Sequence, residues 1–459
     1  MYIISYIQGF PVIEIDHFLT DQESDTLLAS RMQCFKKASS HYPSYYRDND
    51  RYVEDAPKTA NELFLKLKNL DIKEEDFSTK TVRLNERIRF CRYMEGQSFS
   101  THQDGVYFPN HSQASKYTFL LYLNDNFTGG ETEFYNTKLA IKATKNIKPQ
   151  KGKLVIFDHR IWHKGNIITG GNKYILRSDI IVNAPPLETH HQGYIWNLTQ
   201  LDDTRFISCG RDTYIKVWNT DLILLNTFKI HSKSVIKVVQ LDQDHLISCS
   251  RDFTLKKWNL KGEVLASIRF SEMIISIQKY HLDTIIAAGT SGTLYLLTNK
   301  LVIKHTLKIH DNWIWDIILL PGNKIISCCE DGSIHITDLI TQTSIYVYNY
   351  EKPLFCMHLQ DTTVYVGAKD GYVLQLCLTT QRAEKIKIHQ DAIRSILLLE
   401  EIDLFTCGED NRVISTNIHS YISQKCSQSS NFIQDFLIVK NTLYTAGYNG
   451  IIQKIKIED

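Results

Sequence analysis

The feature that most constrains this chain is a sequence pattern that returns seven times in its C-terminal part. The clearest copies are FISCGRDTYIKVW at residues 206–218 and LISCSRDFTLKKW at residues 246–258. The turn residue of each copy recurs at intervals of 39 or 40 residues: Asp212, Asp252, Ser291, Asp331, Asp370, Asp410 and Asn449. Seven units of this period predict a seven-bladed β-propeller, in which each blade is a four-stranded sheet.

Four repeats carry a histidine 17 residues before a Ser or Thr that itself lies four residues before the turn residue: His191, His231, His310 and His389. Trp218 and Trp258 follow their turn residues by six positions. This spacing resembles the WD-repeat family, whose His, Ser/Thr, Asp and Trp form a buried hydrogen-bonded network within a blade. Because an unpaired buried polar group costs about 1–3 kcal/mol, we interpret these histidines as structural.

Blades three, five and seven lack the histidine, and we expect them to depend on apolar packing. The seventh blade shows only three strand-like runs. The segment around Leu187 to Thr189 has the phase of an outermost strand, so we expect it to close that blade and cover its edge. The predicted domains are therefore residues 1–184 and 185–459, with a stiff junction at Pro185 and Pro186.

Residues 1–184 lack this period, and their pattern predicts a different fold. Thr20 and Glu23 match a capping box, which predicts a helix over the run SDTLLASRMQCF. A second helix fits residues 56–70, where leucines recur at helical spacing. After Leu84 come about eight short β-rich runs. Helices followed by such strands favour a double-stranded β-helix (jelly-roll) with supporting helices, so the whole chain is expected to be mainly β.

Composition narrows the partners and the compartment. The net charge of +1 makes nucleic acid an unlikely partner, and no apolar run reaches the length of about 18 residues that a membrane helix needs. Ten cysteines without a CxxC pair, in a chain whose start does not resemble a signal peptide, indicate a reduced intracellular location, which we expect to be cytoplasmic.

Three residues among the predicted jelly-roll strands have metal-ligand chemistry. His102 and Asp104 are two positions apart, so both project from one side of an extended segment, and His163 follows after a further strand. Two imidazoles and one carboxylate form a facial triad that leaves three of six positions open, as non-heme Fe(II) oxygenases require. Alone, an HxD pair is a weak motif.

The surrounding sequence makes the triad specific. YMEGQSFSTHQD, SKYTFLLYLND, GGETEF, KPQKGKLVIFD, WHKG and GGNKYILRSD occur in this order between residues 93 and 179. Together they resemble the prolyl 4-hydroxylase-like 2-oxoglutarate oxygenases over about residues 8–184. The resemblance implies that His102, Asp104 and His163 bind Fe(II). It also implies hydroxylation of a C–H bond with 2-oxoglutarate and O2, with ascorbate as the expected reductant.

The resemblance also implies a cationic side chain for the distal carboxylate of 2-oxoglutarate, on the strand after the second histidine. Lys173 lies at that position, and Arg177 lies four residues further along the same face. We favour Lys173 and keep Arg177 as the alternative, because either cation can bind a carboxylate. Tyr93 and Tyr122 are expected to line the cosubstrate pocket, although both also suit a β-rich core.

Three functions fit these features. The first is hydroxylation of a prolyl or other residue in a protein or peptide that the propeller recruits. The second is an oxygenase acting on a small molecule or a nucleic acid, and the third is an inert scaffold whose propeller mediates protein–protein interactions. The segment at residues 41–52, rich in tyrosine and charge, is either a substrate-covering loop or an ordinary connection.

Overall fold

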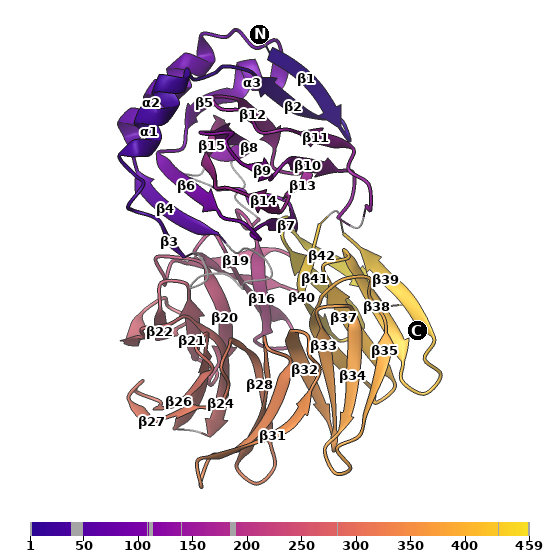
Figure 1. The fold of residues 1–459 in the computed structure, drawn as a ribbon. Coiled ribbons are helices and arrows are strands. Elements are labelled where there is room, and N and C mark those ends of the chain that lie inside the picture. The colour runs from indigo at the N-terminus through magenta and orange to yellow at the C-terminus, as the bar shows by residue number, and fades with distance from the viewer. Residues whose placement is uncertain are drawn as a thin grey trace. The chain divides into compact units, whose positions relative to one another are not determined.

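The computed structural model describes residues 2–37, 49–107, 109, 113–138, 140–183, 190–281, 283–429 and 431–457. The chain divides into two compact units, Met1–Glu188 and Thr189–Asp459 (Figure 1). The predicted boundary between residues 184 and 185, and the strand expected around Leu187 to Thr189, stay predictions because residues 184–189 lie outside the described ones. Residues 41–48 of the predicted loop also lie outside them.

The first unit is a jelly-roll of one large and one small sheet, as the sequence predicted. The large sheet has the order β1 (Tyr2–Ile7), β2 (Phe10–Ile15), β12 (Leu154–Asp158), β8 (Gln113–Tyr122), β15 (Lys173–Asn183), β6 (Arg87–Tyr93), β4 (Asp50–Asp55) and β3 (Lys36–Lys37), with β5 (Thr81–Leu84) paired to β15. The small sheet has the order β11 (Lys145–Ile147), β10 (Thr132–Tyr135), β13 (Trp162–Gly165) and β7 (Phe99–His102). β9 (Thr128–Gly129) and β14 (Ile168–Gly170) form a separate pair.

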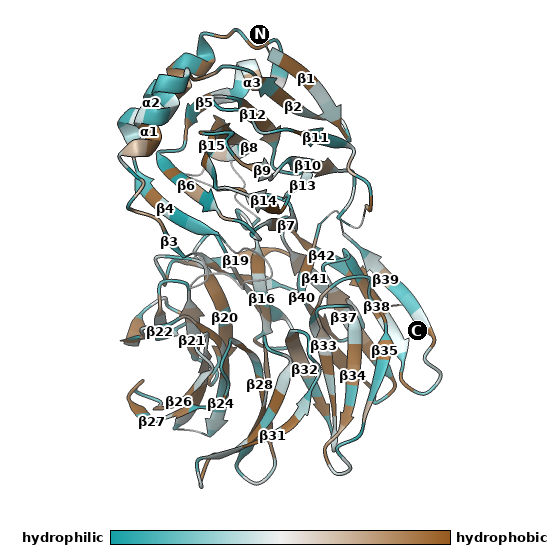
Figure 2. Cartoon of the chain, viewed as in Figure 1, coloured by the Kyte–Doolittle hydropathy of each residue, from teal (hydrophilic) through white to brown (hydrophobic). Residues whose placement is uncertain are grey.

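Three helices support one face of the large sheet: α1 (Asp21–Ala29), α2 (Pro57–Lys68) and α3 (Glu75–Lys80). The predicted capping box is present, because the Thr20 hydroxyl accepts the Glu23 N–H while the Glu23 carboxylate accepts the Thr20 N–H. Leu63, Phe64 and Leu67 of α2 are buried in the core shared with the sheet. The visible side of α2 is mostly hydrophilic (Figure 2), as expected for an amphipathic helix with one face in solvent.

Strand alternation divides the interior of this unit into two cores. Along β15, Leu176 and Ile180 face the core under the helices, whereas Ile175 faces the core between the two sheets. Lys173 and Arg177 share the parity of Ile175, so both point between the sheets. Because side chains alternate between the two faces of a strand, β15 directs two cationic side chains into the interior of the jelly-roll.

The second unit is the predicted seven-bladed propeller. Blades one to three are β16 (Ile195–Gln200), β17 (Arg205–Gly210), β18 (Ile215–Asn219) and β19 (Leu224–Phe228); β20 (Val235–Gln240), β21 (His245–Ser250), β22 (Thr254–Asn259) and β23 (Val264–Arg269); and β24 (Ile274–His281), β25 (Thr284–Gly289), β26 (Thr293–Thr298) and β27 (Ile303–Lys308). Blades four and five are β28 (Ile314–Leu320), β29 (Lys324–Cys329), β30 (Ser333–Asp338) and β31 (Thr343–Asn349); and β32 (Leu354–Gln360), β33 (Thr363–Ala368), β34 (Tyr372–Cys377) and β35 (Ala383–Lys387).

Blade six is β36 (Ile393–Leu399), β37 (Asp403–Gly408), β38 (Arg412–Asn417) and β39 (Ser423–Gln428). Blade seven has three strands among the described residues, β40 (Ile433–Val439), β41 (Thr442–Gly447) and β42 (Ile452–Lys456). The ring closes between blades seven and one, where the Asp435 carboxylate accepts the Leu198 N–H at 2.9 Å and the Tyr444 hydroxyl donates to Thr220 O at 2.6 Å.

The expected histidine network is present in blade one. The Trp218 indole N–H donates to the Ser208 oxygen at 2.7 Å, and Ser208 lies 2.6 Å from His191 Nε2. His191 Nδ1 donates to Asp212 at 2.9 Å. Each donor in this network faces an acceptor, so the buried polar groups are satisfied. The hydrogen bonds link the two middle strands of the blade, β17 and β18, to the segment that precedes β16.

Blades three and five have the expected apolar cores, but they also have polar contacts in place of the histidine network. In blade three, Glu272 accepts hydrogen bonds from Ser291 and from the Tyr295 hydroxyl. In blade five, Asp370 accepts from the Tyr350 hydroxyl at 3.2 Å and pairs with Lys352 at 2.9 Å. Other polar side chains therefore satisfy the turn residue where the histidine is missing. Among the described helices, none is long and apolar enough to cross a membrane.

Candidate metal centre

Two adjacent strands of the small sheet bring the predicted triad together. His102 ends β7 and directly faces His163 of β13 in the strand register. Asp104 lies just beyond β7, where its backbone N–H donates to His159 O at 3.1 Å. The Asp104 carboxylate oxygens lie 3.5 Å from His102 Nε2 and 3.6 Å from His163 Nε2. Residues separated by 61 positions in the sequence therefore converge on one point.

Backbone carbonyls orient both imidazoles. His102 Nδ1 lies 2.7 Å from Ser100 O, and His163 Nδ1 lies 3.0 Å from Ile161 O. A carbonyl oxygen can only accept a hydrogen bond, so each Nδ1 carries the proton and each Nε2 presents its lone pair. This is the tautomer in which a histidine binds a metal through Nε2.

The electrostatics of the cluster suit a cation. Burial lowers the pKa of His102, and burial together with neighbouring His102 lowers the pKa of His163 to about 3. Burial opposes the charge of Asp104, but Arg177 and the two histidines hold the pKa of its carboxyl well below the ordinary value. At neutral pH the cluster therefore has two neutral imidazoles and one carboxylate, the protonation state that metal binding needs.

The donor set fits one six-coordinate metal ion. Two atoms bound at right angles about 2.1 Å from a metal lie about 3 Å apart, close to the separations between Asp104 and the histidines. All three ligand atoms lie within 4.8 Å of one another. Two histidines and a carboxylate on one side leave the other positions open, which is the arrangement of a non-heme Fe(II) site.

Three neighbours support Asp104 and His102. The Arg177 guanidinium forms an ion pair with Asp104, and the Thr118 hydroxyl donates to the same carboxylate. Phe99 stacks on the His102 ring with centroids 3.7 Å apart. Thr118 and Phe99 were not among the predicted site residues. Thr118 shares the strand parity of Leu120, which was the signal in the sequence for its position on this face. Phe99 lies three residues before His102, so strand parity would have placed it on the opposite face.

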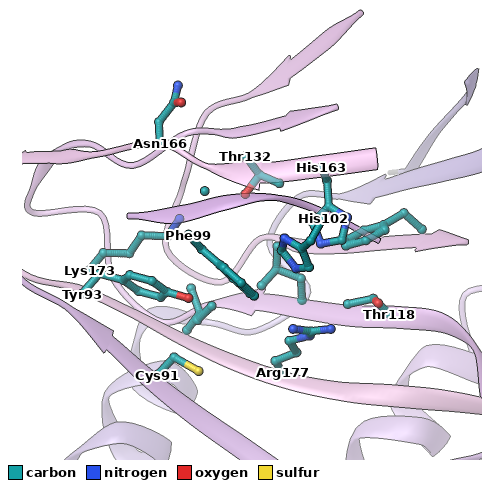
Figure 3. A pocket seen from close by; sticks show the side chains of 14 residues that line it. Cys91, Tyr93, Phe99, His102, Thr118, Thr132, His163, Asn166, Lys173 and Arg177 are labelled. Carbon is teal, nitrogen blue, oxygen red and sulfur yellow. The ribbon is translucent and has the colours of Figure 1, made fainter. Parts of the chain in front are cut away.

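A pocket extends from the metal centre to Lys173 between the two sheets (Figure 3). His102, His163 and Arg177 lie at one side of the view, and Lys173 and Tyr93 lie at the other. The residues that line it are Cys91, Tyr93, Phe99, His102, Thr118, Leu120, Thr132, Phe157, His163, Gly165, Asn166, Lys173, Ile175 and Arg177. The pocket is therefore polar at its two ends and largely apolar between them.

Lys173 is the cation of the far end. Its side chain is buried, its ammonium donates to Gly130 O at 2.5 Å, and it lies 5.8 Å and 5.2 Å from the ring centroids of Tyr93 and Tyr122. Burial lowers the pKa of Lys173 to about 8. Among the described residues no carboxylate forms an ion pair with this ammonium, although the charge of Glu131 acts on it, so it is a favourable place for an anionic ligand group.

Gly130 shapes this end of the pocket. Its φ is +71°, and a Cβ atom there would lie 2.4 Å from Ile168 Cδ1 and 3.2 Å from Lys173 Cδ. A larger residue would therefore displace the lysine side chain. Gly129 and Gly130 both have a positive φ, which glycine adopts without strain, so the pair can form this wall of the pocket beside Lys173.

The two predicted tyrosines have different positions. Tyr93 lines the pocket, whereas Tyr122 is fully buried and its hydroxyl lies 2.6 Å from Thr132 Oγ1. Burial raises the pKa of Tyr122, so its hydroxyl stays protonated. Thr132, which was not predicted, lines the pocket directly and stands between Tyr122 and the cavity.

A second group of potential ligands lies in blade four of the propeller, with His310, Cys329 and Asp331 close together. However, His310 Nε2 lies 2.8 Å from the Ser327 hydroxyl and its Nδ1 lies 2.7 Å from Ser333. Both ring nitrogens are thus used within the blade, which makes this group a variant of the structural network.

Comparison with known proteins agrees with both domains. The model of the 2OG-Fe(II) oxygenase superfamily matches residues 88–178, which include the triad, Lys173 and Arg177. The model of the WD domain, G-beta repeat, matches residues 185–219, 223–259 and 301–338. No curated protein matches the chain. A crystal structure of the computationally designed Ika8 protein is similar at 19% identity and a TM-score of 0.49, over 58% of this chain and 85% of that one.

Proposed function

Because this chain joins a 2OG-Fe(II) oxygenase domain to a WD-repeat propeller, we propose that it hydroxylates a residue of a protein that the propeller binds. The observation that supports the proposal most is a single pocket with a metal-binding triad at one end and a buried lysine at the other. A dicarboxylate that also binds the metal fits between these two ends.

His102, Asp104 and His163 would hold Fe(II) on the small-sheet side of the pocket. When bound, Fe(II) with 2-oxoglutarate supplies the oxidising chemistry, in which one atom of O2 enters the 2-oxo acid, released as succinate and CO2, and the other enters a substrate C–H bond. The neutral histidines and the ionised Asp104 bring one negative charge to the metal, and the buried walls exclude water from the reacting atoms.

Lys173 would bind the distal carboxylate of 2-oxoglutarate, supported by Tyr93 and by Thr132 with Tyr122 behind it. Arg177 would have a different role. It pairs with Asp104 at the metal end, so it orients the carboxylate ligand and partly balances its charge. The structure thus favours Lys173 over Arg177 as the cosubstrate cation, since only Lys173 lies at the far end of the pocket.

The finer features of the proposal rest on the motifs and on the WD repeats. The order of motifs around the triad favours a prolyl 4-hydroxylase-like enzyme acting on a prolyl or other residue, with ascorbate as reductant. WD-repeat propellers generally bind proteins, which favours a protein or peptide substrate over a small molecule. All ten cysteines are free thiols, which suits a reducing, cytoplasmic compartment.

The test is cosubstrate turnover by the purified full-length protein. With Fe(II), ascorbate and carboxyl-labelled 2-oxoglutarate, we expect slow release of labelled CO2 even without substrate. His163→Ala should lower this release at least about 100-fold, because a lost ligand removes more metal affinity than a lost supporting residue. His245→Ala, at a half-buried position in blade two outside the candidate metal centre, is the matched control and should leave turnover unchanged.

Release of CO2 that is equal in wild type and His163→Ala would contradict the proposed metal site. Absence of both turnover and iron binding in the wild type would instead favour the inert scaffold. Mass spectrometry of proteins incubated with the enzyme should then show a gain of one oxygen atom on the substrate.

A further inference from the structure

Four aromatic residues and two arginines form one continuous surface on the propeller, which we call the aromatic platform: Tyr194, Trp196, Arg211, Arg251, Phe432 and Tyr448. Each lies at the start of the first strand of a blade or just after the end of its second strand, in blades seven, one and two. Neighbouring strands are antiparallel, so these positions meet at the same edge of the blades.

The platform is held together by ring contacts. Tyr194 and Tyr448 stack with centroids 4.0 Å apart, Phe432 lies edge-on to Tyr448 at 4.9 Å, and Trp196 lies edge-on to Tyr194 at 5.7 Å. The Trp196 indole N–H donates to the Ser234 hydroxyl at 2.7 Å, which fixes its orientation. The aromatic side chains are thus ordered before any partner arrives, which reduces the entropic cost of binding.

Each arginine lies over one of these rings. The Arg211 guanidinium carbon is 5.0 Å from the Tyr194 centroid, and that of Arg251 is 5.4 Å from the Trp196 centroid. Within residues 190–281, 283–429 and 431–457, neither guanidinium has a carboxylate in an ion pair, and Arg251 Nε is buried without a hydrogen-bond partner. The Nε atom itself is closed to a ligand, but Arg251 and Arg211 are half-buried as residues, so a ligand acceptor would bind the other N–H groups of their guanidiniums.

The carboxylates nearest in sequence to these arginines have other partners. Asp212 binds His191 and the Gln192 N–H, and Asp252 binds His231. In the neighbouring arc of the ring, Glu409 accepts two hydrogen bonds from Arg394. Among the described propeller residues, Arg211 and Arg251 therefore have no carboxylate in an ion pair, whereas Arg394 has Glu409.

The platform combines the residue types that dominate protein-binding surfaces. Trp, Tyr and Arg are the commonest residues that contribute strongly to binding energy, and here they are half-buried rather than fully covered. Met273, Ile275 and Trp313 in the next blades are buried, so the apolar groups that the platform offers are its own aromatic rings. A ligand on the platform would thus meet both cationic and apolar groups.

We propose that the aromatic platform binds an acidic peptide segment of a partner protein, with an Asp or Glu carboxylate on Arg211 and Arg251 and a neighbouring apolar side chain on Trp196 and Tyr448. The inference rests on the proposed docking role of the propeller and assigns it a surface and a ligand chemistry. A planar guanidinium stacked on a ring keeps its N–H groups directed at a carboxylate. Two arginines offer few phosphate contacts, so the platform suits a short carboxylate-bearing segment better than nucleic acid.

The test uses the full-length protein and short fluorescein-labelled peptides in which Glu alternates with Leu or Phe. Matched panels replace Glu with Gln, with Lys or with phosphoserine. Fluorescence anisotropy should show binding of the Glu panel that weakens with added salt, weaker binding of the Gln panel and none of the Lys panel. Arg251→Gln and Arg211→Gln should each lower the affinity about tenfold or more.

Arg269→Gln, at an exposed position of the outermost strand of blade two, is the control and should bind like wild type. Arg251→Lys, which keeps the charge but loses the planar fork, should retain part of the affinity, and circular dichroism melting shows whether each variant is folded. Equal binding of the Glu and Gln panels, binding of only the phosphoserine panel, or no loss in folded Arg251→Gln would each overturn the inference.

His163→Ala separates this inference from the proposed function. If the inference is right, this variant binds the Glu panel like wild type although it releases no CO2. Peptide binding without any turnover in the wild type would contradict the proposed reaction alone, and turnover without peptide binding would contradict the docking inference alone.

Discussion

The candidate metal centre of the jelly-roll and the histidine network of the propeller are built from the same residue types but use them differently. In blade one, His191 has one ring nitrogen on Asp212 and the other on Ser208. In the jelly-roll, His102 and His163 each use Nδ1 on a backbone carbonyl, and their Nε2 atoms lie 3.5 Å and 3.6 Å from Asp104. Those separations exceed the ordinary hydrogen-bond length of about 2.9 Å and suit a shared metal ion.

This difference distinguishes a structural cluster of buried histidines and carboxylates from a cluster that can bind a metal. A network whose donors and acceptors are all matched inside the protein stabilises the fold and has no capacity left for a ligand. In the other kind of cluster, the lone pairs of two imidazoles and one carboxylate point at the same position. A cation at that position stabilises all three groups at once. Substitutions in the two places should therefore change different properties.

The largest effect is expected from His163→Ala compared with His231→Ala. His163→Ala should lower CO2 release and iron content at least about 100-fold with little loss of stability, since it removes a ligand. His231→Ala should keep iron and turnover but cost about 1–3 kcal/mol of unfolding free energy, since it removes the buried hydrogen bonds of the imidazole to Asp252 and Ser248. Iron analysis and thermal melting measure the two effects, and loss of iron from His231→Ala would break the comparison.

The next largest effect is expected from substitutions of the two cationic residues of β15, Lys173 and Arg177, which should change different properties. Lys173→Gln should raise the KM for 2-oxoglutarate about 10- to 100-fold, because a charge-assisted contact is lost, and should leave iron affinity unchanged. Arg177→Gln should weaken iron binding about tenfold through Asp104 and leave the KM for 2-oxoglutarate nearly unchanged. Steady-state kinetics and iron titration give both values, and the reverse pattern would exchange the two roles.

The pH dependence of cosubstrate binding should follow Lys173, whose pKa is lowered to about 8 by burial. Only the protonated ammonium attracts a carboxylate, so the KM for 2-oxoglutarate should be constant below pH 8. Above it the KM should rise about tenfold per pH unit as the proton is lost. Lys173→Arg keeps its charge over this range and should show no such rise if the lysine is responsible.

The smallest effect is metal-dependent stability. Mn(II), which occupies such sites without oxidative chemistry, should stabilise the wild type by about 2.7 kcal/mol at 100 times its dissociation constant, because it binds the folded state alone. The shift should persist in His231→Ala and disappear in His163→Ala. Differential scanning fluorimetry with and without a chelator measures it, and a shift that survives His163→Ala would place the metal elsewhere.

Much of the fold was predictable because its signals are periodic or local. The interval of 39 or 40 residues predicted seven blades, and the capping box of Thr20 and Glu23 predicted the start of α1, which ends at Ala29. The blades without the histidine were predicted less well. Glu272 and Tyr350 satisfy their turn residues from positions that do not match the repeat's histidine pattern, so the spacing rule did not find them.

By itself, the sequence determined the blade count, the jelly-roll and the ligand types of the triad, because repeat period, strand alternation and residue chemistry are all readable along one dimension. Only the tertiary structure decided which end of the pocket holds Lys173 and which holds Arg177, since parity places both on the same face of β15. It also decided that Thr118 and Phe99 contact Asp104 and His102 and that Arg211 and Arg251 lie over the rings of Tyr194 and Trp196. These contacts depend on how far apart the strands lie in the folded protein, which the order of residues along the chain does not determine.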